Sequence, residues 1–169
     1  MPLGPVVVVS RSANVRDFAA SIGANTLIEK KHDLNDAICR GTDWAQEHDA
    51  SGVLILPLDL PLLSTSVLEK LVEAGCQPLP SMVIVPCRHR QGTNALLLSP
   101  PDLVPTQFGL HSFTKHWQLA QQVGIKPCIY HAPQLAFDLD TPEDWLEFTM
   151  LEPKSKEFLL TTEPLKTMN

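Results

Sequence analysis

The sequence predicts an α/β protein of three layers, with a mostly parallel sheet between two layers of helices. Short apolar runs such as Val6–Val9 and Val53–Leu56 have the length and composition of buried strands. Amphipathic stretches with capping residues separate these runs. Strands that alternate with helices are typical of βαβ units, whose crossovers produce parallel strands covered on both faces.

In the first half of the chain, the expected helices have recognisable starts and ends. Ser12 is an N-cap candidate and Gly23 marks the helix end. The residues at helical spacing between them are apolar: Val15, Phe18, Ala19 and Ile22. A strand over Thr26–Glu29 and a helix from Leu34 to about His48 follow, and Thr65 or Ser66 is expected to cap a helix that ends at Gly75.

The second half predicts four more strands and two more helices. The strands are Met82–Val85, Ala95–Leu98, Cys128–His131 and Leu135–Phe137. Ser112 precedes a helix that ends at Gly124, and Pro142 opens the last helix. Residues 1–152 are expected to form one domain, and residues 153–169 a loosely packed extension.

Composition narrows the class of protein. The net charge of −6, with no basic run, argues against binding to nucleic acid or to an anionic membrane. No apolar stretch approaches the roughly 20 residues that span a bilayer, and the N-terminus does not resemble a signal peptide. The four cysteines are widely spaced, so we expect reduced thiols and a cytoplasmic protein.

Ligands of parallel α/β sheets bind outside the carboxyl ends of the strands, where the strand order reverses. The residues expected to carry chemistry are therefore those just after Val9, Leu56, Val85, Leu98 and Phe137.

Asp138 and Asp140 are expected to face the same way, because residues i and i+2 of an extended segment do so. At roughly 5–6 Å their repulsion is about 3 kcal/mol at an effective dielectric near 20, which favours a bound cation such as Mg²⁺. Glu143 and Asp144 need no such site, because Thr141 onward has the features of a helix start. Asp59, just past an apolar strand, is either a turn residue or a third ligand.

Two glycine-containing segments could bind an anion. Gly92-Thr93-Asn94 offers hydroxyl and amide donors, although a plain strand-entry turn is the favoured interpretation. Gly109 and Ser112 lie at a helix N-terminus, which suits a phosphate, while Ser112 without a ligand would be a simple N-cap. The remaining candidates are interpreted as surface or core histidines: His111, His116 and His131.

Four segments in this order, LPLDLPLL, GTNALLLSPP, QFGLHSFTKH and LAFDLDTPEDW, resemble the 2-phospho-L-lactate guanylyltransferase (CofC) family of the MobA-like nucleotidyltransferase superfamily. The resemblance runs from about Val6 to Phe148. It implies a Rossmann-like fold of the nucleotide-diphospho-sugar transferase type. It also implies that GTP is joined to a three-carbon phosphoacid, either 2-phospho-L-lactate or phosphoenolpyruvate, with release of pyrophosphate in the biosynthesis of the deazaflavin coenzyme F-420.

The resemblance also implies roles for individual residues. Mg²⁺ would be held by Asp59, Asp138 and Asp140. The phosphoacid would be held by Thr93, Gly109 and Ser112. Asn35, in a segment similar to the family's Gly-Leu-Asn-x-Ala, would lie by the nucleotide.

The sequence departs from the family at two places. Pro86-Cys87-Arg88 has cysteine where the family usually has an acid. The family's first strand and basic nucleotide-binding loop have no counterpart before Val6–Val9, which leaves that strand and Val53–Leu56 without their shared neighbour. Another segment fills the gap, or the start of the reading frame lies upstream, or guanylyl transfer has been lost.

The alternatives to the enzyme are thus a remnant that binds phosphoacid and Mg²⁺ but not GTP, and an enzyme for another nucleotide. Exposed sheet edges also favour a homodimer.

Overall fold

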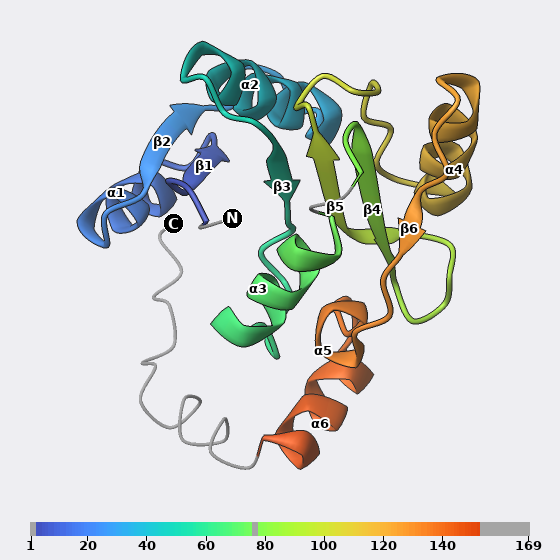
Figure 1. Cartoon of the computed structure of the whole chain (residues 1–169). Helices are drawn as coiled ribbons and strands as arrows, with labels where there is room; N and C mark the ends of the chain where they lie inside the picture. The colour runs from blue at the N-terminus through green and yellow to red at the C-terminus, as the bar shows by residue number, and fades with distance from the viewer. Residues whose placement is uncertain (1–2, 76–77, 153–169) are drawn as a thin grey trace.

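The computed structural model describes residues 3–75 and 78–152, and its elements follow the expected order (Figure 1). The elements are β1 (Val7–Ser10), α1 (Ala13–Ser21), β2 (Asn25–Ile28), α2 (Leu34–Glu47), β3 (Val53–Ile55), α3 (Thr65–Ala74), β4 (Ser81–Pro86), β5 (Thr93–Ser99), α4 (Ser112–Gln122), β6 (Cys128–Ile129), α5 (Pro133–Ala136) and α6 (Pro142–Leu151). The expected extension over residues 153–169 lies outside the described residues. Within the described part, no helix has the length and apolar character that crossing a bilayer requires.

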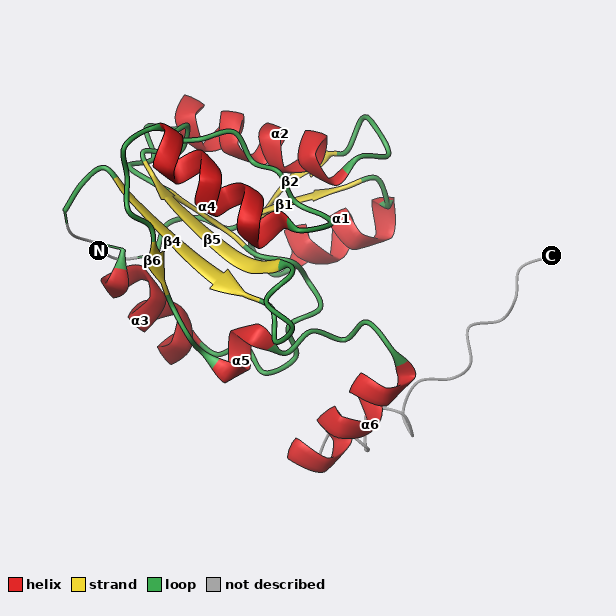
Figure 2. Ribbon diagram, turned by 90° about the vertical axis from the view of Figure 1, so that its right-hand side faces the viewer, coloured by secondary structure: helices red, strands yellow, loops and turns green. Residues whose placement is uncertain are grey.

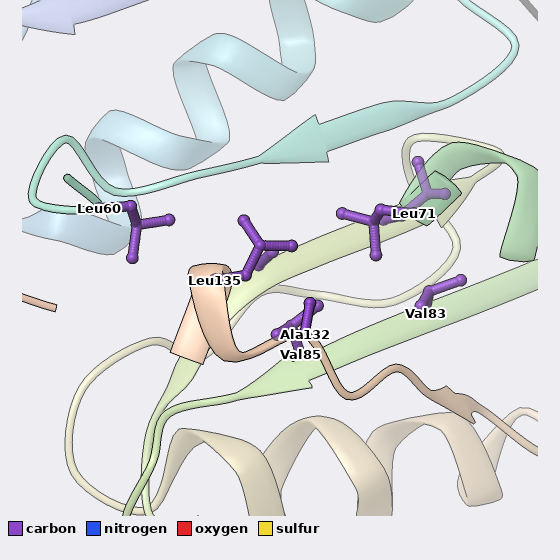
Figure 3. Close-up of a cluster of buried hydrophobic side chains, with 8 residues drawn as sticks. Leu60, Leu71, Val83, Val85, Ala132 and Leu135 are labelled. Carbon is purple, nitrogen blue, oxygen red and sulfur yellow. The ribbon is translucent and has the colours of Figure 1, made fainter. Parts of the chain in front are cut away.

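Helices cover both faces of a four-stranded sheet of order β3-β5-β4-β6, as the sequence predicts (Figure 2). Alternate residues of β4 and β5 supply the two cores. On one face, Val83, Val85 and Leu97 pack with Leu71 of α3 and Leu135 of α5 (Figure 3). On the other face, the core contains Met82, Ile84, Leu96, Leu98 and Ala120.

Strand β5 runs against the direction of its neighbours. It pairs antiparallel with both β3 and β4, whereas β4 and β6 are parallel. The reason is its connection: the short loop over residues 87–92 returns the chain as a hairpin, with no crossover helix. The other three strands share one direction.

The sheet is divided where the sequence predicts a missing neighbour. Strand β1 pairs in parallel with β2 in a separate two-stranded sheet, and the described residues contain no pairing between β1 and β3. Helix α2 contacts both β1 and β3, so it lies across the division. The Cβ that Gly41 of α2 lacks would stand 3.5 Å from Val9 Cγ2, in ordinary contact.

Two local predictions are wrong. The segment expected to be a strand at Leu135–Phe137 belongs largely to helix α5, because the N–H groups of Leu135 and Ala136 donate to the carbonyl of Ala132. The N-cap of α3 is Ser64, one residue before the two candidates.

The apolar side predicted for α1 is exposed. Phe18 and Ile22 are 66% and 69% accessible, and Ala19 is the helix residue that is buried. Helix α1 packs mainly on β1 and β2, and these two short strands leave Phe18 and Ile22 uncovered.

Candidate active site

The candidate site lies at the edge where β3 and β4 end and β5 begins. Asp59 follows β3, and Thr93 is the first residue of β5. The prediction for residues after Leu98 is wrong, because the reversed direction of β5 puts its carboxyl end at the opposite edge. At the candidate site, the amino end of β5 lies where the prediction put its carboxyl end.

A backbone hydrogen bond joins the two segments that carry the aspartates. The N–H of Leu139 donates to the carbonyl of Asp59 at 3.1 Å, so Asp138 and Asp140 flank a residue bonded to Asp59. Burial raises the pKa of the Asp59 carboxyl, and the negative charges of Asp140 and Asp138 raise it further. Asp140 and Asp138 therefore lie near enough to Asp59 to disfavour its ionisation.

Arg88 is a cation beside this group that the sequence interpretation did not use. Its Nε lies 4.0 Å from Asp138 Oδ1, and its guanidinium also pairs with Asp144 and Glu147. The guanidinium carbon stands 4.9 Å from the ring centroid of Phe137, within cation–π range. Part of the charge of Asp138 is thus balanced by the protein itself.

The helix start at Thr141 is confirmed, and it also orders the aspartate segment. Thr141 and Asp144 form a capping box, and the same Asp144 carboxylate accepts from the N–H of Asp140 at 3.0 Å. Burial acts to raise the pKa of Asp144, but bonds from Thr141 and Arg88 outweigh it and lower the pKa. Asp144 therefore links Arg88 to the backbone of Asp140.

Carboxylate oxygens are suitable donors for Mg²⁺, which usually takes one or two protein carboxylates together with phosphate oxygens and water. Among the residues that the structure describes, no three His, Cys, Asp or Glu side chains are grouped closely enough to hold a metal alone. The donor chemistry fits the ion, with a phosphate completing the shell. The metal role of Asp59, Asp138 and Asp140 stays a prediction.

A β-bulge sets the direction of Thr93. The register between β4 and β5 shifts at Val85/Pro86, where Pro86 lies opposite Thr93 and Val85 opposite Ala95. Regular alternation would place Thr93 with Ala95 and Leu97, on the face of α3 and α5. The extra residue instead lets Thr93 Oγ1 reach His116 of α4, at 3.0 Å.

His116 is fully buried and bonds through both ring nitrogens. Nδ1 contacts Thr93 Oγ1 at 3.0 Å, and Nε2 accepts from the backbone N–H of Gln107 at 3.0 Å. Burial, with a smaller contribution from Lys115, lowers the pKa of His116 to about 4. His116 therefore connects β5 to the segment before α4.

Gly109 and Ser112 form the turn into α4. Gly109 has φ +105°, a conformation that side chains rarely tolerate, and its carbonyl accepts from the N–H of Ser112 at 3.0 Å. Ser112 is the first residue of the helix and is buried; the N-cap position belongs to His111. The interpretation of Ser112 as an N-cap is thus wrong.

Asn35 uses its side-chain amide on this same segment. Its Oδ1 accepts from the N–H of Phe108 at 2.7 Å, and its Nδ2 donates to the Phe108 carbonyl at 3.2 Å. The start of α2 is thereby fixed to the residue before Gly109. Contact between Asn35 and a nucleotide stays a prediction.

The family model for CofC-like guanylyl transferases matches residues 2–163. The chain belongs to this family. A phosphoenolpyruvate guanylyltransferase of Rubrobacter xylanophilus is 41% identical over 139 residues, which are 82% of the chain and 67% of that relative. A 3-phospho-D-glycerate guanylyltransferase of Colwellia psychrerythraea is 34% identical over 143 residues, 85% of the chain and 67% of the relative. The chain thus spans about two thirds of the length of these CofC-like relatives.

Solved structures support the fold predicted for the family. A protein of Desulfovibrio desulfuricans described as a nucleotide-diphospho-sugar transferase matches with a TM-score of 0.66 and 11% identity, over 95% of the chain and 71% of that protein. A CMP:2-keto-3-deoxy-manno-octonic acid synthetase gives a TM-score of 0.62 with 11% identity, over 90% and 82% of the two chains. The nucleotidyltransferase-like, Rossmann-like fold is therefore confirmed.

Sequence reasoning left two side chains of this candidate site, His116 and Arg88, without a role. His116 was grouped with surface or core histidines, although a polar residue recurring four positions after Ser112 on one helix face was a usable signal. Arg88 was noted only beside a departure from the family. Asn94 is buried, and its Nδ2 has no hydrogen-bond partner among the described residues.

Proposed function

We propose that this chain joins GTP to a phosphorylated three-carbon acid, such as 2-phospho-L-lactate or phosphoenolpyruvate, and releases pyrophosphate. The observation that supports this most directly is the bonded pair of segments carrying Asp59, Asp138 and Asp140, in a chain of the CofC-like family. Relatives named as guanylyltransferases favour GTP over other nucleotides. Their names also cover three different phosphoacids, so the acceptor is proposed as a class.

In the proposed reaction, a phosphate oxygen of the acid forms a bond to the α-phosphorus of GTP. The bond from that phosphorus to the bridging oxygen breaks, and pyrophosphate leaves with the electron pair. Phosphoryl transfer depends chiefly on alignment and charge neutralisation, so a covalent nucleophile is not needed. Bound Mg²⁺ would neutralise phosphate charge beside Asp59, Asp138 and Asp140.

The acid would lie against Thr93, Gly109 and Ser112. Its phosphate faces the amino end of α4, where the helix dipole favours an anion. Arg88 keeps the segment of Asp138 and Asp140 in place through Asp144. We place the reaction in the biosynthesis of coenzyme F-420 and in the cytoplasm, which suits the unpaired thiols of Cys39, Cys87 and Cys128.

Pyrophosphate release, measured with GTP, Mg²⁺ and each phosphoacid in turn, tests the proposal. Asp140→Asn should abolish turnover without unfolding the chain, and the exposed Asp17→Asn is the matched control. A folded sample that turns over none of the acids would contradict the enzyme. Binding of phosphoacid with no binding of GTP would identify the remnant instead, and turnover with CTP or ATP alone would identify a different nucleotidyltransferase.

A further inference from the structure

His116 has a defined protonation pattern inside the protein. The backbone N–H of Gln107 can only donate, so Nε2 must accept with a free lone pair. The ring is therefore neutral, in keeping with the lowered pKa of His116. Its one proton sits on Nδ1 and points to Thr93 Oγ1, 3.0 Å away.

This pattern determines what the Thr93 hydroxyl can do. A hydroxyl has one proton to donate and lone pairs to accept. Because the hydroxyl accepts from His116 Nδ1–H, its own proton must go to another group. Among the described residues, no group accepts that proton. Thr93 is only 7% exposed. The hydroxyl is thus an oriented donor.

The neighbouring residue supplies an independent sign of a ligand. Asn94 is 5% exposed, and its Nδ2 lacks a hydrogen-bond partner among the described residues. Buried donors normally have partners, because an unmet one costs about 1–3 kcal/mol. Two adjacent residues at the start of β5, Thr93 and Asn94, therefore each have a hydrogen-bond donor without an acceptor among the described residues.

We propose that His116 is a positioning residue: it orients the Thr93 hydroxyl as a donor to a carboxylate or phosphate oxygen of the phosphoacid. The proposal rests on the proposed function and deepens it. The same imidazole holds the N–H of Gln107, and its ring meets the ring of Phe108 edge-on with centroids 4.9 Å apart. His116 thereby fixes the hydroxyl of Thr93 relative to the turn at Gly109.

Two substitutions separate the functions of the two ring nitrogens. In His116→Gln the side-chain oxygen can replace Nε2 as acceptor for Gln107, while the donor to Thr93 is lost. In His116→Asn the amide nitrogen can replace Nδ1 as donor to Thr93, while the acceptor for Gln107 is lost. Thr93→Val removes the hydroxyl and keeps the shape, and Thr93→Ser keeps the hydroxyl.

Calorimetric binding of phosphoenolpyruvate to the full chain with Mg²⁺ measures the effect without requiring turnover. His116→Gln and Thr93→Val should each weaken binding by about tenfold, as loss of one hydrogen bond to a charged group predicts. The double variant should be no weaker than Thr93→Val alone. Thr93→Ser should bind almost as tightly as the parent, and His116→Asn should bind more tightly than His116→Gln.

The outcomes distinguish the two proposals. Binding losses that multiply in the double variant would overturn the role of His116 and leave the proposed function intact. A parent chain that binds none of the three phosphoacids would overturn the acid site itself.

Nitrogen–proton correlation spectra of the parent imidazole provide a test that needs no ligand and no variant. A proton on Nε2, or on both nitrogens, at neutral pH would overturn the proposal.

Discussion

Asn35 bonds through its side-chain amide to both backbone groups of Phe108, 73 positions along the chain, at 2.7 and 3.2 Å. This pair fastens the start of α2 to the segment that leads into Gly109 and Ser112. The residue that the family resemblance assigns to the nucleotide is therefore in direct contact with the segment assigned to the acid.

Removing this contact should destabilise the protein. Asn35→Ala leaves the N–H and carbonyl of Phe108 without these partners, which should lower the free energy of unfolding by about 1–3 kcal/mol. Denaturant unfolding measures the loss. Asn25→Ala, which removes a single 3.5 Å bond from an exposed side chain, is the control and should change stability by about 0.5 kcal/mol or less. Equal losses in the two variants would contradict the role given to Asn35.

Arg88 should matter for stability mainly at neutral pH. Arg88→Met leaves Asp144 and Asp138 without their cation and should lower the free energy of unfolding at pH 7. The pKa of Asp144 is lowered from its ordinary 3.8, so the stabilisation is present above that value and is lost as pH falls below it.

Unfolding of the parent and of Arg88→Met, compared at pH 7 and pH 3, checks this sign. The difference should shrink at the lower pH. Arg88→Lys keeps the charge but not the fork of donors, and should give an intermediate loss. A deficit of the same size at both pH values would show that Arg88 acts through packing on Phe137.

The ionised Asp59 should oppose folding in the absence of metal. The raised pKa means that ionisation of Asp59 is disfavoured in the folded state. The contribution of Asp59 to the free energy of unfolding therefore decreases as the pH rises above 3.8, the ordinary pKa of the group. At pH 7, Asp59→Asn should therefore melt at a temperature at least as high as that of the parent. Added Mg²⁺ should raise the melting temperature of the parent and leave Asp140→Asn unchanged. Equal responses to Mg²⁺ would place the ion elsewhere.

His116 should make the protein sensitive to mild acid. The folded ring has a pKa of about 4 and the unfolded ring about 6.5, so between these values the unfolded chain binds a proton that the folded chain does not. Stability should fall as pH falls through this window, by at most about 3 kcal/mol. Urea midpoints measure the slope. His116→Gln should flatten it, and the exposed His131→Gln should not.

Much of the fold follows from local signals in the sequence. The starts of α1, α2 and α6 are set by capping side chains within three or four positions, so their bounds could be predicted. Leu135–Phe137 could not be assigned by periodicity, because three apolar residues fit a strand and a helical turn equally well. The direction of β5 depends on a short loop whose hairpin geometry is set by pairing with β4.

The site was predictable to the extent that its residues carry charge or a motif. Asp59, Asp138 and Asp140 could be named as candidates because carboxylates after apolar segments are conspicuous. The hydrogen bonds of His116 and Asn35 could not be predicted, because each side chain bonds to a backbone group or to a residue distant in the sequence. Such contacts exist only after folding. Thr93 reaches His116 because the β-bulge turns its side chain to the opposite face of the sheet.

Because the sheet is divided, its two parts should open with different free energies. Strands β4 and β5 are paired on both sides, whereas β1 and β3 each have one paired side among the described residues. Amide hydrogens of β4 and β5 should accordingly exchange with deuterium only on global unfolding, while those of β1 and β2 exchange through local opening. Thr93 belongs to β5, and its hydroxyl bonds to His116 of α4. The half that contains β4 and β5 should thus persist in native form under conditions that melt the β1–β2 half.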